Sequence, residues 1–190
     1  TTLEHWLLPA LTAWVIGLPL SQIPFGPAYW IGFILGAVLL MAVLIAEYIS
    51  IDAEDARQPA AAAVLTAVSF TLFLAMSISL RLGGSRLFTI LPALTLAAFL
   101  VSLRTLHLRL QGQWLVLHSG VIALLVAQLA TALHYWPAPP VTYGLILLGP
   151  AYALTSLIGS VHRGEPLRQA LIEPSVVIAV VWGAAYLWLR

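Results

Sequence analysis

The stretch YWIGFILGAVLLMAVLIAEYI, residues 29–49, decides how this chain folds. It contains one charged residue, Glu47, close to its end. A helix needs about 20 mostly apolar residues to cross the hydrocarbon core of a bilayer. The length and composition of this stretch therefore predict a transmembrane helix.

The composition of the whole chain extends this prediction. Of the 190 residues, 62% are apolar and 8% are charged, and the mean hydropathy is +1.01. Soluble domains carry about 25% charged residues, so we expect an integral membrane protein. The chain has no cysteine and no lysine, which excludes disulfides, thiolate metal sites and Schiff-base chemistry. Its formal charge of +1 predicts no nucleic-acid partner.

Seven segments are long and apolar enough to span a bilayer. The sequence therefore predicts an all-α transmembrane bundle, with residues 1–190 forming a single transmembrane domain and no soluble domain. Pro9 and Pro19 interrupt the first segment, which predicts a kinked or partly re-entrant helix. The predicted segments are 5–24, 29–49, 60–80, 87–105, 113–133, 141–161 and 172–189.

The charged residues predict an orientation. Seven spans place the two termini on opposite sides, and five of the eight arginines lie near the loops on the N-terminal side. Because cytoplasmic loops carry the excess of positive charge, we expect a cytoplasmic N-terminus and an extracytoplasmic C-terminus. All seven acidic residues also fall on or near the N-terminal side, whereas the opposite side keeps His134 as its one histidine.

Two halves of the chain resemble each other. The letters LPALT occur at Leu8–Thr12 and again at Leu91–Thr95, and Gly36 aligns with Gly120 at an offset of 84. Contiguous repeats of three spans are inverted relative to each other, as in many transporters. The alternative is chance, since segments rich in Leu, Ala, Val and Gly match readily. A 3+3 inverted repeat plus one helix and a chance match therefore both remain open.

Asp52 and Asp55 lie one helical turn apart in the run DAEDAR. This spacing resembles the paired carboxylates with which membrane prenyl and phosphoalcohol transferases hold Mg²⁺. Such sites need a second acidic pair, and Glu165 and Glu173 are not at helical spacing. We therefore interpret this acidic run as a solvated loop at the solvent-exposed end of the second span, and we predict no metal site.

Ionisable residues within apolar segments are candidates for a functional site because they are costly in a membrane. Glu47 is near the end of the second span, and Arg104 is placed similarly in the fourth and could pair with it. His118 lies one to two turns inside the fifth span. It could ligate a pigment through one axial bond, but no second histidine is expected nearby and an interhelical hydrogen bond is more common. No cofactor is predicted.

Three functions remain open. The first is a non-enzymatic accessory or scaffold subunit that packs against partner helices or lipids, because no charge sits at the centre of a span and no catalytic set is complete. Gly32 and Gly36, one turn apart, favour close helix packing, either within the fold or with a partner helix. The second is a small carrier of an apolar or amphipathic solute. The third is a lipid-modifying enzyme, whose candidate residues are Asp52, Asp55, His107, His118 and Glu173.

Overall fold

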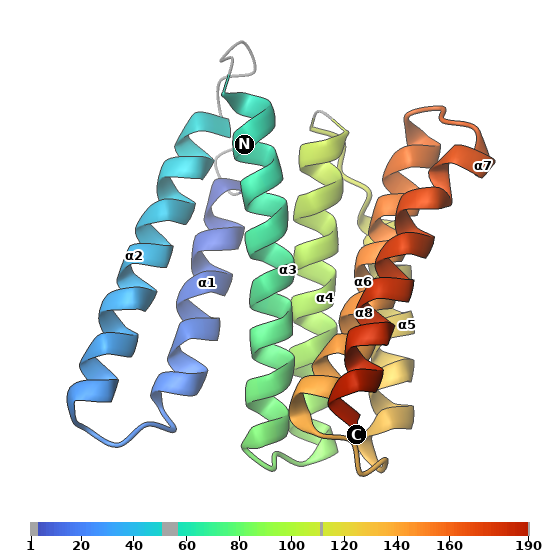
Figure 1. The fold of residues 1–190 in the computed structure, drawn as a ribbon. Coiled ribbons are helices and arrows are strands. Elements are labelled where there is room, and N and C mark those ends of the chain that lie inside the picture. Colours follow the sequence, from blue (N-terminus) through green and yellow to red (C-terminus); the bar gives the residue numbers. More distant parts are fainter. Residues whose placement is uncertain (1–3, 51–56, 111, 190) are drawn as a thin grey trace. The chain divides into compact units, whose positions relative to one another are not determined.

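A computed structural model describes residues 4–50, 57–110 and 112–189. All regular structure in these ranges is helical, and none of it is β-strand. The chain divides into two compact units, Thr1–Leu72 and Phe73–Arg190, and each is described by itself. The elements, coloured along the chain in Figure 1, are α1 (Glu4–Leu20), α2 (Pro27–Ser50), α3 (Gln58–Leu82), α4 (Leu87–Arg109), α5 (Val116–His134), α6 (Pro140–His162), α7 (Leu167–Ala170) and α8 (Ile172–Leu189).

Six helical segments are long and apolar enough to cross a membrane: α2, α3, α4, α5, α6 and the combined segment Leu167–Trp188. Six of the seven predicted segments are therefore long apolar helices, which indicates a multi-pass integral membrane protein. The remaining segment, α1, is apolar but only 17 residues long, or about 25 Å. That is shorter than the hydrocarbon core of about 30 Å, so a seventh span stays a prediction.

In the first unit, α1 and α2 form an antiparallel hairpin. Small residues on α2 allow the close approach. A Cβ added to Gly36 would lie 2.5 Å from Ile16 Cγ2, and one added to Gly32 would lie 3.1 Å from Leu20 Cδ2. Glycine therefore lets the α1 side chains reach the backbone of α2. Most of the other α2 side chains are exposed.

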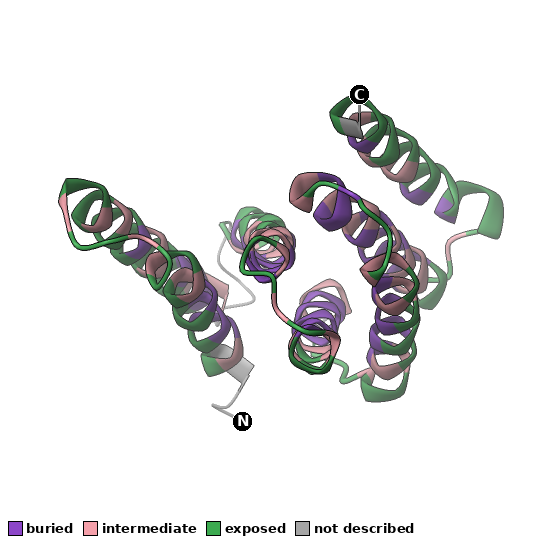
Figure 2. Cartoon of the chain, turned by 90° about the horizontal axis from the view of Figure 1, so that it is seen from below, coloured by how far each residue is buried: buried purple, intermediate pink, exposed green. Residues whose placement is uncertain are grey.

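In the second unit, α6 is the central helix and packs against α4, α5 and α8. Buried residues lie on the facing sides of α4, α5 and α6 (Figure 2). A Cβ on Gly144 would lie 2.9 Å from Leu74 Cδ1 in the last part of α3, and one on Gly149 would lie 2.9 Å from Trp182 Nε1 in α8. These two glycines let α6 approach both neighbours closely.

Several buried hydroxyl groups bond within their own helices. Ser77 donates to the carbonyl of Phe73, Ser102 to Ala98 and Thr155 to Ala151, each at 2.7 Å. A polar group without a partner is costly in an apolar interior, and a bond to the carbonyl one turn earlier satisfies it. These three hydroxyl groups are thus compatible with burial in a membrane.

Candidate functional site

Nine polar side chains of the second unit gather at one end, where α4 and α6 finish and α5 and α8 begin (Figure 1). They form two hydrogen-bonded networks and a histidine pair. We call this group the polar end cluster, and its members are Arg109, His118, Tyr152, Ser156, Ser160, His162, Arg163, Glu165 and Glu173.

The sequence of α6 builds one side of the cluster. Tyr152, Ser156 and Ser160 follow each other at intervals of four residues, which places them on one face of the helix. Gly159 leaves room beside this face. A Cβ there would lie 3.4 Å from Arg109 Cδ and 3.7 Å from Arg163 Nη1, so both arginine side chains pass close to the end of α6.

The first network joins α4, α6 and α8. Arg109 donates from Nη1 to Ser156 Oγ at 3.0 Å and from Nη2 to Tyr152 Oη at 3.4 Å. Tyr152 in turn donates to Glu173 Oε1 at 2.5 Å, and the same carboxylate oxygen lies 3.6 Å from Arg109 Nη2. The side chains of Arg109 and Glu173 are 19% and 48% exposed. One arginine therefore links three helices within reach of solvent.

The second network closes the end of α6. Arg163 donates to Glu165 Oε1 at 2.9 Å from Nε and forms an ion pair with it at 2.8 Å, and it also donates to Ser160 Oγ at 3.0 Å. Gly164 has φ +77°, a conformation that glycine adopts without strain. The hydrogen bond from Arg163, and a further one from Ser160, hold the pKa of the Glu165 carboxyl below its ordinary value.

The third part of the cluster is a pair of histidines. The rings of His118 on α5 and His162 on α6 lie edge to face, with centroids 4.9 Å apart. The expectation that no second histidine lies near His118 is therefore wrong. It arose because His162 was assigned to a loop, whereas α6 extends to that residue. His162 Nδ1 lies 2.9 Å from the Ile158 carbonyl, and since a carbonyl only accepts, Nδ1 carries the proton.

Among the residues that the structure describes, no three His, Cys, Asp or Glu side chains are placed to hold a metal ion together. The histidine pair offers at most two ligands to a metal. Because Nδ1 of His162 faces the Ile158 carbonyl, its Nε2 is the atom that can bind a proton or a hydrogen-bond donor. Two imidazoles in contact can relay a proton or bind a polar group.

The other predicted site residues lie in several places. Glu47 in α2 is only 3% exposed, and Ser50 Oγ lies 3.5 Å from its Oε2. Arg104 in α4 is 1% exposed and is among the largest fully buried side chains. Since Glu47 belongs to the first unit and Arg104 to the second, their pairing stays a prediction. Asp52 and Asp55 lie outside the described residues.

His107 does not lie in a loop, as the predicted end of the fourth span at residue 105 implied. Helix α4 extends to Arg109, so His107 is in its last turn and is 8% exposed. Its ring lies against Trp114, with centroids 4.3 Å apart. The helix extends because a long arginine side chain at its end can reach polar surroundings while its backbone stays at the membrane boundary.

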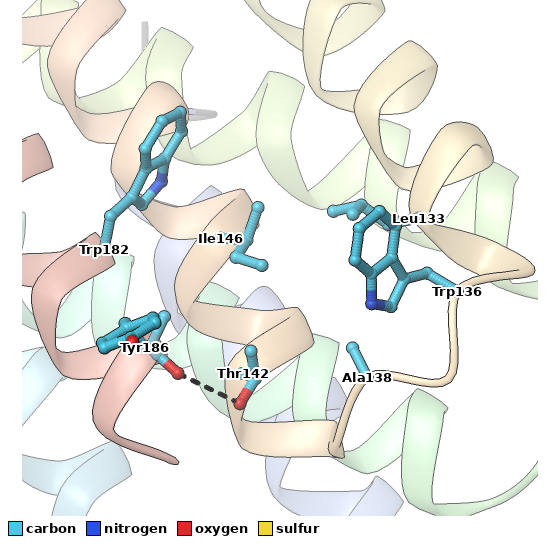
Figure 3. A pocket seen from close by; sticks show the side chains of 8 residues that line it. Leu133, Trp136, Ala138, Thr142, Ile146, Trp182 and Tyr186 are labelled. Carbon is cyan, nitrogen blue, oxygen red and sulfur yellow. Dashed lines mark hydrogen bonds between the residues drawn. The ribbon is translucent and has the colours of Figure 1, made fainter. Parts of the chain in front are cut away.

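A second feature lies at the opposite end of this unit. An apolar cavity of about 290 Å³ opens between the end of α5, α6 and α8. Figure 3 shows Trp136, Trp182 and Tyr186 around it, with Ile146 between them. The hydroxyl of Thr142, the polar group on its α6 side, is directed to the Ala185 carbonyl at 3.5 Å. The cavity therefore suits an apolar ligand.

Sequence reasoning missed most members of the polar end cluster. It selected Glu173 and His118, but not Arg109, Tyr152 or Ser156, which contact them or their partners. The signal that could have found them is the four-residue spacing of polar residues from Tyr152 to Ser160 in an otherwise apolar helix. The aromatic cavity had no comparable signal, because tryptophan and tyrosine are common at both membrane boundaries.

Comparison with known proteins gives one result. No curated protein and no solved structure shows significant similarity to the chain. One family model, described as a protein of unknown function (DUF5656), matches residues 1–188. Because the match covers nearly the whole chain, including both units and the polar end cluster, the protein belongs to the DUF5656 family.

Proposed function

We propose that this protein is a non-enzymatic accessory or scaffold subunit, which packs against partner helices in the membrane and docks a partner through the polar end cluster. One observation carries the proposal: the charged groups of the cluster are paired with each other yet remain partly exposed. Arg109 and Glu173 are 19% and 48% exposed, and Arg163 and Glu165 are 38% each.

The chemistry of the cluster favours recognition over catalysis. A nucleophile is activated by an adjacent base that is itself free to accept a proton. Here the Glu173 carboxylate already accepts from Tyr152 and lies beside Arg109. Exposed ion pairs in general contribute about 0–1 kcal/mol to stability. We therefore infer that the main effect of these pairs is to present a fixed pattern of charge at the surface. Such a pattern gives a protein surface specificity for its partner.

Two helices offer faces for lipid or partner helices. Most of α2 and of α8 is exposed and apolar. On α8 the exposed side chains include Val176, Val180 and Leu187. In a bilayer such faces contact lipid tails or other helices, which is what a subunit that works by packing requires.

The proposal is tested by native gel electrophoresis of protein extracted from its own membrane in a mild detergent. We expect wild type to migrate in a larger complex, and R109Q to lower the fraction in the complex because it removes the residue that joins three helices. The matched control is R168Q, which removes an exposed arginine of α7 at the same end. Equal losses in R109Q and R168Q, or no complex in wild type, would overturn the proposal.

A second candidate function is a carrier of an apolar or amphipathic solute. It is favoured by grooves at related places in the suggested repeat: Gly36 lines one between α1 and α2, and its counterpart Gly120 lines one between α4 and α5. The residues of the LPALT repeat correspond less well, since Leu91, Pro92 and Thr95 line the second groove and their counterparts do not line the first. Solute-dependent uptake into proteoliposomes would establish a carrier.

A third candidate is a lipid-modifying enzyme, favoured by the contact between His118 and His162. An enzyme that uses this pair should lose turnover completely in H118Q, and one that uses the acidic run should lose it in the double variant D52N/D55N. A docking surface should instead lose partner binding gradually with each change. Measurement of both properties in the same variants separates the two functions.

A further inference from the structure

We propose that Arg81 and the apolar cavity beside Trp136 form a binding site for one anionic phospholipid. The phosphate would bind Arg81, and an acyl chain would occupy the cavity. This site lies at the opposite end of the second unit from the polar end cluster. It therefore does not depend on the docking function proposed above.

Arg81 is a cation whose partners are neutral. It donates from Nη1 to the His134 carbonyl at 2.8 Å and from Nη2 to the Trp136 carbonyl at 2.7 Å. Its Cζ lies 5.2 Å from the centre of the Tyr143 ring. A guanidinium has five N–H donors, so these bonds fix its position while leaving donors for another ligand. The side chain is partly exposed.

No acid compensates this charge within the described part of the unit. The sequence has no Asp or Glu between Asp55 and Glu165, and both acids of the second unit, Glu165 and Glu173, bond to arginines at the other end. An uncompensated cation at a membrane boundary attracts anionic headgroups.

Two residues that contact Arg81 each carry a buried side-chain atom without a hydrogen-bond partner among the described residues. These atoms are Tyr143 Oη and His134 Nδ1. Each belongs to a residue that contacts Arg81, through its ring in one case and its carbonyl in the other. Buried polar atoms usually have partners, so the hydrogen-bonding capacity around Arg81 exceeds what the described chain uses.

The cation and the cavity share one short segment. The Trp136 carbonyl binds Arg81, and the Trp136 side chain lines the cavity together with that of Leu133 (Figure 3). The cavity volume of about 290 Å³ is at the lower limit of ordinary ligand pockets, which suits part of one acyl chain. Tryptophan and tyrosine belong at headgroup level. A phosphate above an apolar slot at this level is the arrangement of a phospholipid.

The test is native mass spectrometry of the delipidated full-length protein, titrated with phosphatidylglycerol or phosphatidylcholine. We expect one phosphatidylglycerol to bind in preference to phosphatidylcholine. R81Q should weaken phosphatidylglycerol binding about tenfold, because it removes the charge-assisted hydrogen bonds between the guanidinium and the phosphate. The matched control R86Q removes a neighbouring exposed arginine and should change binding less than twofold.

A cavity variant keeps the test decisive if R81Q does not fold. I146W fills the cavity from α6 and leaves Arg81 unchanged, so it should weaken binding of both lipids. Equal binding of the two lipids by wild type, an equal effect of R81Q and R86Q, or unchanged binding in I146W would overturn the proposal. Tight binding of glycerophosphoglycerol, which has no acyl chains, would also overturn it, since it would identify a headgroup site without the cavity.

Discussion

Gly36 shows how a single residue sets the spacing of two helices. An added Cβ would meet Ile16 Cγ2 at 2.5 Å, whereas a Cβ added to its aligned counterpart Gly120 would meet nothing within 4 Å. The two glycines therefore have different roles despite their matching place in the suggested repeat. The Ile16 side chain occupies the space in which a side chain at position 36 would lie, whereas the corresponding space beside Gly120 is empty.

This difference gives a matched pair of variants. G36A should lower the free energy of unfolding by about 1–3 kcal/mol because it overpacks the α1–α2 contact. G120A should leave stability unchanged or raise it slightly, since alanine favours a helix more than glycine does. Unfolding in mixed detergent micelles, followed by circular dichroism, measures both. The account is wrong if G36A is as stable as G120A, or if I16A, which removes the contacted atom, does not reduce the cost of G36A.

The lowered pKa of Glu165 predicts how the stability of the folded state depends on pH. Its pKa is lowered because Arg163 and Ser160 donate hydrogen bonds to the ionised carboxyl. A group with a lowered pKa stabilises the folded state above its ordinary pKa, about 4.3 for glutamate, and loses this effect as the pH falls through the lowered pKa. NMR of ¹³C-labelled glutamate should show Glu165 titrating below the ordinary value, and R163Q should move the titration upward. No movement in R163Q would contradict the assignment.

Tyr152 connects α6 to the start of α8 through Glu173. Y152F removes this hydrogen bond, a loss of about 1 kcal/mol. We expect the first turns of α8 to open more often and to exchange amide hydrogens faster, while α5 is unaffected. Hydrogen–deuterium exchange with mass spectrometry measures this, with Y135F, which removes an exposed hydroxyl at the other end, as the control. Unchanged exchange in Y152F would mean that packing alone holds α8.

The elements were largely predictable, and their ends were less so. Apolar runs predicted six spans to within a few residues, because a bilayer demands a fixed length of apolar helix. The predicted end of the fourth span fell at residue 105, four residues before the end of α4 at Arg109. The polar end cluster was largely hidden, since Arg109, Tyr152 and Glu173 come from three helices. The contact between these three side chains depends on the close packing of Arg109 beside Gly159, and a single sequence does not reveal which helices pack together.

The number of membrane spans determines whether the two termini lie on the same side of the membrane or on opposite sides. If α1 crosses the membrane as a seventh span, the termini lie on opposite sides. The chain has no cysteine, so single cysteines can be introduced without a background. We expect a membrane-impermeant maleimide to label an N-terminal cysteine tag and a cysteine at the exposed Gln22 from opposite sides. Labelling of both from the same side would show that α1 is re-entrant.

The proposed docking function requires that this protein associates with another membrane-protein subunit. Native mass spectrometry of wild-type protein released gently from its own membrane tests this requirement. We expect a complex of fixed stoichiometry, which R109Q dissociates and R168Q does not. A protein that is released alone, with the same mass in both variants, would rule out a docking function.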